Sequence, residues 1–417
     1  MTPREAAALL SLSLPPLNGR ARRLAAARTV SDFRRIAKRR LPRSVFDYVD
    51  GGADEEHSLH DNAAAIREWR FTPRSLVDVS EATTATTILG HPASAPIGFA
   101  PTGYTRMISP LGEPAVAEAA AHCGLPYTLS TMATTSLEEL AEHPSARAAD
   151  RWFQLYVWKD RGLSRDLIRR AADSGYRVLE VAVDTAVSGM RVRDARNGFT
   201  VPPRLTPASA LGIARKPGYW TGMLRSPALA FANVASGGTD GGGYTIENIS
   251  KQFDPAVTWN DLADIRSRWP GKLLLKGPVG PEDARRARDL GVDGLHLSNH
   301  GGRQLDRTVA PIDLVRPVRE ALGDDFGIVV DSGFTHGEDI AVAIALGADA
   351  AFVGRAYLWG LVAAGAQGVE AVAELLRTEL LRTAQLLGVT SIAELRRRGP
   401  ELLRHRSSAS DPLPLSP

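Results

Sequence analysis

A histidine and two arginines in this 417-residue chain have the types and spacing that proton abstraction beside a carboxylate requires. His300 ends an apolar run and stands three residues before Arg303. Its imidazole ionises near neutral pH and can act as a general base. Asp184 ends another apolar run and is a candidate to orient that imidazole. Arg191 and Arg303 can clamp a carboxylate through their planar guanidinium groups.

Two further cations predict a cofactor that carries a phosphate. Lys276 is the only charged residue in the apolar run Leu273–Lys276, and a buried ammonium needs an anion beside it. Gly354 and Arg355 follow the last apolar run, where barrel enzymes often build a phosphate site. Together these residues indicate a base, a small carboxylate and a phosphate-bearing cofactor.

Other chemistries find little support in the sequence. The nine histidines form no HxxxH or HxH cluster, and His300 has no cysteine or carboxylate ligand near it in sequence, so we expect no metal site. The GxSxG and GxxxxGK[ST] motifs of acyl-serine and P-loop chemistry are absent.

The elements that must position these residues are short apolar runs, most of them followed by a helical pattern. Near-continuous apolar strands separated by helices indicate a parallel sheet covered on both faces. Eight such units fit a closed (β/α)8 barrel of the α/β class better than an open sheet. The runs are Ala95–Ala100, Tyr127–Thr131, Trp152–Val157, Val178–Asp184, Leu273–Lys276, Gly294–His300, Gly327–Gly333 and Ala350–Arg355.

Each run ends in polar or glycine residues, and in this fold the carboxyl ends of the strands carry the active site. A single polar residue there could simply satisfy the rim of the barrel. Because all eight runs end in this way, we predict a functional site at this end of the barrel. The residues are Pro101-Thr102-Gly103, Ser130, Gln154 with Tyr156, Asp184, Lys276, Ser298 with His300, Asp331, and Gly354-Arg355.

The chain divides into one barrel with additions. Residues 1–90 form an N-terminal extension with helical stretches at Ser31–Arg40 and Arg43–Val49, packing on a barrel at 91–390. An insertion at about 193–258 separates the fourth and fifth strands and is too long for an ordinary loop. Residues 391–417 are expected to be a C-terminal tail.

Composition and charge exclude some partners and compartments. The net charge is only +3, which predicts no nucleic-acid partner, and the arginine-rich stretches near both ends are typical of solvated helix faces. Cys123 is the only cysteine, which rules out an internal disulfide and, with no apolar run long enough to span a membrane, favours a cytoplasmic protein.

The run Leu297-Ser-Asn-His-Gly-Gly-Arg-Gln-Leu-Asp306 closely resembles the signature of the FMN-dependent α-hydroxy acid dehydrogenases, which include glycolate oxidase, L-lactate dehydrogenase and mandelate dehydrogenase. The resemblance covers about residues 29 to 390, and its details look most like actinobacterial L-lactate dehydrogenases of the respiratory type. The other motifs follow in the family's order: Phe46-Asp-Tyr48, Ala100-Pro-Thr-Gly103, Leu129-Ser-Thr131, Phe153-Gln-Leu-Tyr156, Val183-Asp184, Lys276-Gly277 and Val353-Gly-Arg355.

The resemblance implies FMN as cofactor, a tetramer, and a role for each matched residue. Tyr48, Arg191 and Arg303 would hold the substrate carboxylate. Tyr156 would hydrogen-bond the substrate hydroxyl, and His300 would be the base, paired with Asp184. Lys276 would lie at the N1–C2 edge of the flavin. The remaining flavin contacts would be Pro101, Thr102, Gly103, Ser130, Gln154 and Ser298 on the ring, and Asp331, Gly333, Gly354 and Arg355 on the ribityl chain and phosphate.

Three positions depart from the family pattern, and all three concern the grip on the cofactor. Ala182 stands where a flavin-contacting Thr is usual, and Ser332 replaces a Gly. Thr335 stands where many members have a phosphate-binding Arg. Losing one charged contact would weaken FMN binding by about 1.5–3 kcal/mol unless a neighbour such as His336 compensates.

Substrate, electron acceptor and surroundings stay open at this stage. The expected reaction oxidises an L-2-hydroxy acid, with L-lactate first, and passes electrons to a quinone or cytochrome. Whether His300 takes the Cα proton or the hydroxyl proton is also left open. The alternatives are a soluble oxidase that uses oxygen, a dehydrogenase for a bulkier acid such as mandelate, another phosphate-binding barrel such as an isomerase, and a non-catalytic flavin-binding relic.

Two features of the sequence bear on these choices. Met132 stands where glycolate oxidase has a large Trp, and a flexible Met could admit more than a methyl group. The insertion mixes apolar and aromatic residues with basic ones, which suits either a lid or oligomer contact, or a peripheral contact with an anionic membrane.

Overall fold

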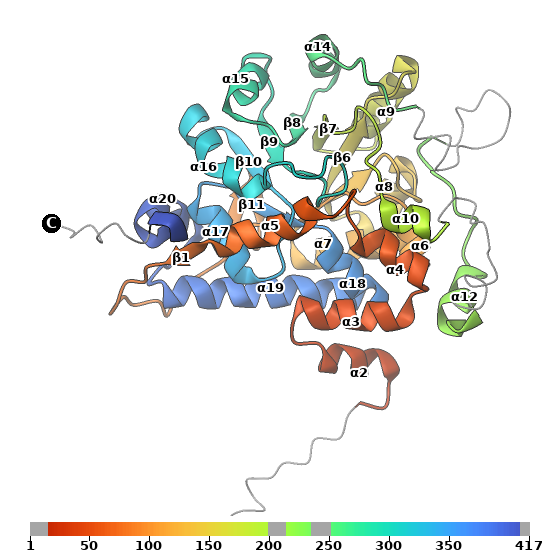
Figure 1. Ribbon diagram of the computed structural model, residues 1–417, viewed down its shortest axis with the longest axis horizontal. Coiled ribbons are helices and arrows are strands. Elements are labelled where there is room, and N and C mark those ends of the chain that lie inside the picture. The colour runs from red at the N-terminus through yellow and green to blue at the C-terminus, as the bar shows by residue number, and fades with distance from the viewer. Residues whose placement is uncertain (1–15, 199–213, 235–251, 409–417) are drawn as a thin grey trace, which may run out of the picture.

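A computed structural model describes residues 16–198, 214–234 and 252–408 of the chain. At its centre is a closed barrel of parallel strands in the order β10-β11-β4-β5-β6-β7-β8-β9, surrounded by helices (Figure 1). The predicted (β/α)8 barrel is therefore confirmed. The strands are β4 (Ile97–Phe99), β5 (Pro126–Ser130), β6 (Asp150–Tyr156), β7 (Val178–Ala182), β8 (Lys272–Gly277), β9 (Gly294–Leu297), β10 (Gly327–Val330) and β11 (Ala350–Val353).

Each barrel strand coincides with one predicted apolar run, and the main difference lies at the carboxyl ends. Four of the runs extend from two to three residues past the observed strand, as Gly294–His300 does past Leu297. His300 has a φ of 58° and Ser332 a φ of 80°, in the left-handed region, so the chain has left the extended conformation by these points. The polar residues at the ends of these four runs thus stand past the strands, whereas Ser130, Gln154, Tyr156 and Lys276 lie within β5, β6 and β8.

Helices cover the outside of the barrel, and several begin at residues that favour a helix start. Pro281 and Pro311 occupy the first turn of their helices, where the missing N–H costs nothing. The covering helices are α7 (Gly112–Cys123), α8 (Leu137–Glu142), α9 (Arg161–Asp173), α14 (Trp259–Arg268), α15 (Pro281–Asp289), α16 (Pro311–Leu322), α17 (Gly337–Ala345), α18 (Arg355–Ala364) and α19 (Ala366–Leu386).

The amino end of the barrel is closed by a hairpin of β2 (Thr86–Ile88) and β3 (His91–Ala93). Ile88 is buried in one apolar cluster with Trp152 and Phe352 from inside the barrel. Gly98 makes room for this packing, because a Cβ there would lie 2.3 Å from the Phe352 ring. The barrel is therefore filled at this end, and only its carboxyl end remains for a ligand.

The N-terminal extension packs on the carboxyl-end side through α2 (Gly19–Ala26), α3 (Val30–Arg40), α4 (Arg43–Asp50) and α5 (His57–Arg67). The α3 helix lies against α18, and α5 lies against α16 and α17 (Figure 1). A Thr29 capping box fixes the start of α3. This extension brings Tyr48, at the end of α4, to the barrel mouth.

The predicted C-terminal tail differs from what the structure shows for its first part. Residues 392–408 are folded: α20 (Ile392–Leu402) packs on α17, and β12 (Leu403–His405) pairs with β1 (Trp69–Phe71). Leu395 and Leu402 are fully buried. The many arginines of this stretch made it look like an exposed tail, although α20 has an apolar face that packs on α17.

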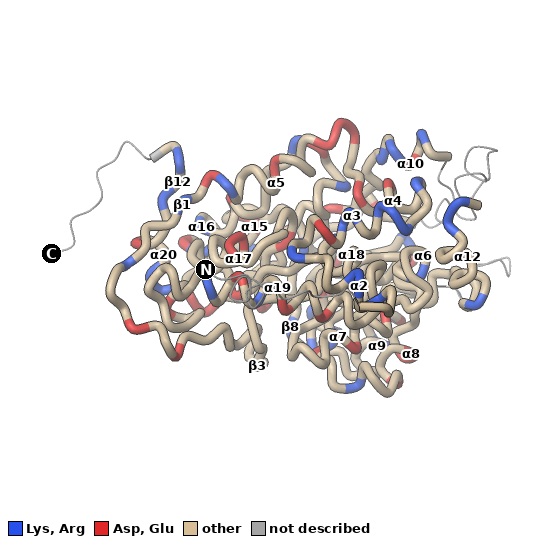
Figure 2. Tube along the Cα trace, turned by 90° about the horizontal axis from the view of Figure 1, so that it is seen from below, with Lys and Arg blue, Asp and Glu red and all other residues tan. Residues whose placement is uncertain are grey.

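The insertion between β7 and β8 contains α10 (Val192–Arg196) and α12 (Pro217–Met223) in its described part. Residues 199–213 and 235–251, which include the predicted Gly-rich run Ser236–Gly243, lie outside the described residues. The α12 helix lies at the edge of the molecule (Figure 2). Just before this helix, the Lys216 Nζ donates a hydrogen bond to the Arg39 carbonyl at 2.5 Å.

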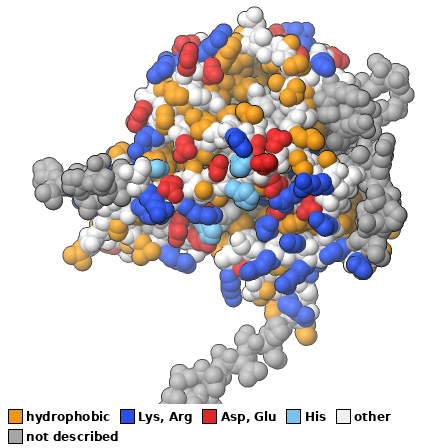
Figure 3. Space-filling view, viewed as in Figure 1, with side chains coloured by type: hydrophobic (Ala, Val, Ile, Leu, Met, Phe, Trp, Pro, Cys, Tyr) orange, Lys and Arg blue, Asp and Glu red, His pale blue; other side chains and the backbone are white. Residues whose placement is uncertain are grey.

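Lys and Arg gather on the lower part of the face in Figure 3, where α2 and α3 lie. Among the described residues, no helix is long and apolar enough to cross a membrane.

Candidate active site

A cavity of about 470 Å³ opens at the carboxyl end of the barrel and collects most of the predicted site residues. Its lining includes Tyr48, Pro101, Thr102, Gly103, Met132, Tyr156, Arg191, Lys276, His300, Arg303, Asp331, Gly333, Gly354 and Arg355. Four predicted residues lie behind this lining and hold it in place. They are Asp184, Ser130, Gln154 and Ser298, each hydrogen-bonded to a lining residue or to a neighbour of one.

His300 is held at both ring nitrogens. Its Nδ1 lies 3.1 Å from Asp184 Oδ2, and its Nε2 lies 3.0 Å from the Tyr156 hydroxyl. The backbone N–H of His300 donates to Ser298 Oγ at 3.0 Å, which fixes the turn. With Asp184 accepting the Nδ1 proton, Nε2 is the nitrogen that faces the cavity and is able to accept a proton.

The His300 turn adopts a backbone conformation that L-residues rarely use. Its φ of 58° is followed by positive values at Gly301 and Gly302. A Cβ at Gly302 would lie 2.5 Å from the backbone N of Leu59, so the turn packs tightly on α5. Strain of this kind persists where surrounding contacts impose it and concentrates at functional sites.

Arg191 and Arg303 both lie over the Tyr48 ring, with Cζ atoms 5.7 Å and 5.0 Å from its centroid. Arg303 donates to the carbonyls of Tyr48 and Gly51 at 2.6 Å and 3.1 Å. Burial, and then repulsion from Arg191, lower the pKa of Arg303. Two guanidinium groups in a buried position favour an anion between them.

Arg191 has an acidic partner that the motifs did not reveal. Its Nε donates to Asp194 Oδ2 at 2.7 Å, within the first turn of α10. Burial lowers the pKa of Arg191, but Tyr48 and Asp194 outweigh it and raise the pKa overall. The carboxylate of Asp194 therefore anchors this guanidinium and keeps it charged.

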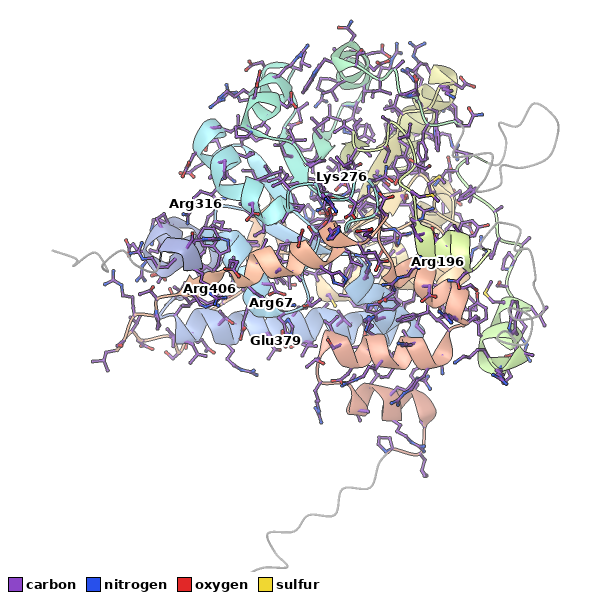
Figure 4. All side chains as sticks on the ribbon, viewed as in Figure 1. Arg67, Arg196, Lys276, Arg316, Glu379 and Arg406 are labelled. Atoms are coloured by element: carbon purple, nitrogen blue, oxygen red, sulfur yellow. The ribbon has the colours of Figure 1, made fainter. Side chains whose placement is uncertain are left out.

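Lys276 has the buried anion that the sequence required. Its Nζ lies 2.6 Å from Asp331 Oδ2, and the Lys276 side chain is 2% exposed. Figure 4 shows Lys276 in the interior of the barrel, whereas the other labelled residues lie at its periphery. Burial raises the pKa of Asp331, but Lys276 and His296 hold it well below its ordinary value, so the carboxylate stays charged.

Ser332, one of the three departures, has a structural task. Its Oγ donates to Asp331 Oδ1 at 2.8 Å and accepts from the Gly301 N–H at 3.0 Å. The hydroxyl thus joins the turn after β10 to the turn that carries His300. A glycine at this position would have no side chain to make that link.

The wall formed by Ser130 and Gln154 supports the expected flavin contact. Ser130 Oγ donates to Gln154 Oε1 at 2.9 Å, which fixes the orientation of the amide. Gln154 Nε2 is buried and has no hydrogen-bond partner among the described residues. A buried amide donor without a partner is costly, and a ring carbonyl or nitrogen of a flavin in the cavity would satisfy it.

The phosphate end differs in detail from the expectation. The Arg355 guanidinium donates to the carbonyls of Val49, Gly51 and Gly301, each at 2.9 Å. Burial and repulsion from Arg303 lower the pKa of Arg355 to about 10. In this arrangement the side chain joins the end of α4 to the His300 turn. Its charge therefore lies within the cavity wall, at the end where the sequence predicts a phosphate.

Helix starts and glycines shape the rest of that end. Gly354 is the N-cap residue of α18 and has no side-chain cap. Gly333 has a φ of 96°, and a Cβ there would lie 2.8 Å from the backbone of Asn62. Thr335 and His336 turn toward Asp339, whose Oδ2 accepts from both backbone N–H groups at 2.8 Å and 2.9 Å. The N-terminus of α18 can attract an anion without an arginine side chain.

The fold and the cavity together are typical of a barrel enzyme with its site at the carboxyl ends of the strands. The family model of the FMN-dependent dehydrogenases matches residues 37–402. The chain belongs to this family, whose cofactor is FMN.

Individual relatives agree with this membership. The chain is 46% identical to the "Putative L-lactate dehydrogenase" of Mycobacterium tuberculosis, across 96% of this chain and 95% of that one. It is 37% identical to the (S)-mandelate dehydrogenase of Pseudomonas putida, across 88% and 92% of the two chains. A crystal structure of the monotopic membrane protein (S)-mandelate dehydrogenase matches with a TM-score of 0.85 and 36% identity, covering 91% of this chain and 99% of that one.

Sequence reasoning missed several residues around the site. Glu180 and His296 are charged or ionisable residues within apolar strands, and the argument applied to Lys276 would have found them. Phe231, in the insertion, lines the cavity and is 2% exposed, and no sequence pattern set it apart from its apolar neighbours.

If Arg191 holds a substrate carboxylate, Arg191→Lys should weaken binding of oxalate by about tenfold or more. Lysine keeps the charge but loses the paired N–H groups that bind both oxygens. Titration of the flavin absorbance with oxalate measures this. Arg196→Lys is the matched control, because Arg196 is an exposed residue on the same helix. Equal oxalate affinity in both variants would remove Arg191 from the binding site.

Proposed function

We propose that this protein oxidises L-lactate to the 2-oxo acid and passes the electrons to a quinone or cytochrome. The observation that carries the proposal is His300 Nε2, which faces the same cavity as Arg191 and Arg303 while Asp184 holds the opposite ring nitrogen. A base beside a pair of cations suits a small acid with a hydroxyl next to its carboxylate. The relatives named as L-lactate dehydrogenases support lactate as the substrate.

In this proposal the protein's own residues bind and orient the acid. Arg191, Arg303 and the Tyr48 hydroxyl hold the carboxylate, and Tyr156 donates a hydrogen bond to the substrate hydroxyl. Burial raises the pKa of Tyr156 well above its ordinary value, so the phenol keeps its proton and can donate it in a hydrogen bond. FMN, when bound, accepts the two electrons.

His300 takes up the proton that the substrate loses. Its Nε2 accepts the proton, and Asp184 stabilises the resulting imidazolium through Nδ1. The Lys276 ammonium, at the cavity wall, favours negative charge on the cofactor. Each group is fixed before the substrate arrives, because Ser298, Ser332 and Asp331 hold the turns from which they project.

His300→Gln should retain FMN and slow flavin reduction by L-lactate by about 10²–10⁴-fold, as expected for a lost general base. Stopped-flow absorbance under anaerobic conditions measures the rate, and the flavin spectrum confirms that the cofactor is bound. Flavin reduction at the wild-type rate would show that His300 is not the base.

The size of the substrate depends on the part of the cavity wall formed by Gly103, Met132 and Phe231. Gly103 and Met132 are in contact there, since a Cβ on Gly103 would lie 2.9 Å from Met132 Cβ. Phe231 also lines the cavity and packs on Tyr104 with ring centroids 4.8 Å apart. A half-buried Met can move, but the Phe231–Tyr104 pair limits the room for an aromatic substituent. Mandelate is the second candidate, favoured by the neighbours named as mandelate dehydrogenases.

L-Lactate and L-2-hydroxybutyrate should reduce the flavin with higher kcat/KM than glycolate or L-mandelate. Phe231→Ala should raise the mandelate-to-lactate ratio, because it removes the aromatic side chain from this wall. Anaerobic flavin bleaching with each of the four acids tests both statements. A strong wild-type preference for mandelate would replace lactate as the substrate, and no bleaching by any acid would support a non-catalytic relic.

We further propose that the insertion makes a peripheral contact with an anionic membrane, on the cytoplasmic side, where a quinone is reached. Leu224 at the end of α12 is 83% exposed, and Trp220 on the same helix is half-buried. The exposed basic residues of α3 lie next to this helix through the Lys216–Arg39 contact. Apolar side chains flanked by basic ones match the interface of an anionic bilayer.

Not every apolar residue of the insertion takes part in this contact. Phe231 is buried, and Tyr219 is tied down by its hydroxyl, which donates to the Met107 carbonyl at 2.7 Å. Leu211 and Ile213 lie outside the described residues. The proposed contact therefore rests on Trp220 and Leu224 and on the neighbouring basic side chains.

The protein should sediment with vesicles of anionic lipid, and less so as the salt concentration rises, because screening weakens the basic contribution. Leu224→Asp should abolish sedimentation and quinone reduction while leaving flavin reduction by lactate unchanged. Leu386→Asp is the matched control, since Leu386 is 72% exposed on α19. Failure of the wild type to bind vesicles, together with fast turnover on oxygen, would indicate a soluble oxidase.

A further inference from the structure

The inside of the barrel contains a polar layer directly below the cavity. Barrel interiors are filled by layers of four side chains from alternate strands, and bulky apolar residues usually dominate them. Here Thr128, Glu180, His296 and Phe352 come from β5, β7, β9 and β11, and each is 0% exposed. Three of the four are therefore polar or ionisable where aliphatic residues are usual.

Direct contacts connect the members of this layer. His296 Nδ1 lies 3.0 Å from Glu180 Oε1, and the Thr128 hydroxyl donates to the same oxygen at 3.3 Å. The His296 and Phe352 rings lie 5.2 Å apart. The next layer toward the amino end is apolar, with Trp152, Leu274 and Val329. The charge is thus confined to the side that faces the cavity.

The polar layer also contacts the ion pair at the cavity floor. His296 Nε2 lies 3.1 Å from Asp331 Oδ2, the oxygen that Lys276 Nζ approaches to 2.6 Å. Lys276 pairs with His296 in the register of β8 and β9. Glu180, His296, Asp331 and Lys276 therefore form a continuous line of alternating charge from the middle of the barrel to the cavity.

The acidic neighbours of His296 favour its protonated form. Burial and Lys276 lower its pKa, but Glu180 and Asp331 outweigh them and raise it above the ordinary value. These are the ionisable groups that face His296 from β7, β8 and the end of β10, and Phe352 on β11 is apolar. Buried ion pairs seldom stabilise a fold more than well-packed apolar residues of similar volume would. We therefore look for a role of these four charged residues other than stabilising the fold.

We propose that Glu180 and His296 are positioning residues that set the redox potential of the bound FMN through Asp331 and Lys276. The His296 cation partly neutralises the Asp331 carboxylate. The carboxylate then screens the Lys276 ammonium less, and the positive potential at the flavin ring is higher. Glu180 holds the proton on His296. Both effects favour the reduced, negatively charged cofactor. The inference rests on FMN as cofactor and not on lactate as substrate.

His296→Gln should make the reduction of FMN about tenfold less favourable at low pH, where His296 is protonated, which corresponds to a potential lower by about 30 mV for a two-electron couple. The uncharged amide no longer offsets the Asp331 charge. Glu180→Gln should match the wild-type potential at low pH and fall below it at higher pH. Without the Glu180 carboxylate the pKa of His296 decreases, and its proton is lost over that range. Equilibration of the holoenzyme with a reference dye, from pH 5.5 to pH 8.5, measures both.

Thr128→Val is the matched control, because it changes the same layer without changing charge, and it should leave the potential unaltered. The double variant Glu180→Leu/His296→Leu removes both charges together and leaves neither one buried without a partner. It should therefore fold even if a single replacement does not. Its flavin redox potential should also be lower than that of the wild type. The stability of the wild type relative to this double variant should be greatest at low pH. It should decline as pH rises through the raised pKa of His296, because a raised pKa stabilises the protonated folded state.

The affinity of the bound flavin for sulfite is a second measurement, and it needs no hydroxy acid substrate. Sulfite adds reversibly to oxidised flavin and leaves negative charge near the ring edge, so its affinity should fall in parallel with the potential. Wild-type potential and sulfite affinity in His296→Gln and in the double variant would overturn the proposal and leave the layer a purely structural feature. Because neither measurement uses a hydroxy acid, failure of the lactate proposal would leave this test intact.

Discussion

An excess of buried positive charge at one end of the barrel is the constraint on which the site depends. Lys276, Arg191, Arg303 and Arg355 all line one cavity. Each cation is partly satisfied by a fixed partner: Asp331 for Lys276, Asp194 for Arg191, and backbone carbonyls for Arg303 and Arg355. These partners hold the cations in place without cancelling them. Burial lowers the pKa of Arg303 and Arg355, and an anion in the cavity would favour the charged form of both guanidinium groups.

The carbonyls that hold these arginines belong to segments far apart in the chain. Arg355 starts α18, yet its guanidinium reaches the end of α4 and the turn after His300. Arg303 bonds to the same end of α4. The N-terminal extension is therefore part of the active site and not an appendage. It packs beside the mouth of the barrel, brings Tyr48 close to both arginines, and accepts hydrogen bonds from Arg303 and Arg355.

Polar residues below the cavity extend the same electrostatic arrangement into the core. The alternating charges of Glu180, His296, Asp331 and Lys276 end at the cavity floor, and the apolar layer beneath them ends at the β2–β3 hairpin. A charge buried in a low-dielectric interior acts over a longer distance than one at the surface. Residues that never touch a ligand can therefore tune the chemistry at the mouth.

The sequence by itself determined the barrel, because eight apolar runs, each followed by a polar end, have few other ways to be buried. It also identified the family, since the run around His300 keeps its types and spacing, and it named most of the residues that the structure brings together at one cavity. Only the tertiary structure decided how those residues are held. Asp194 beside Arg191, the Ser332 link to Gly301, and the turning of Arg355 into the wall all depend on contacts between distant segments. The folded stretch 392–408 and the partner of His296 depend on them too. Periodicity and motif spacing indicate which residues of one helix or strand face inward. The closure of the barrel and the helices packed across its mouth determine which of these residues come into contact.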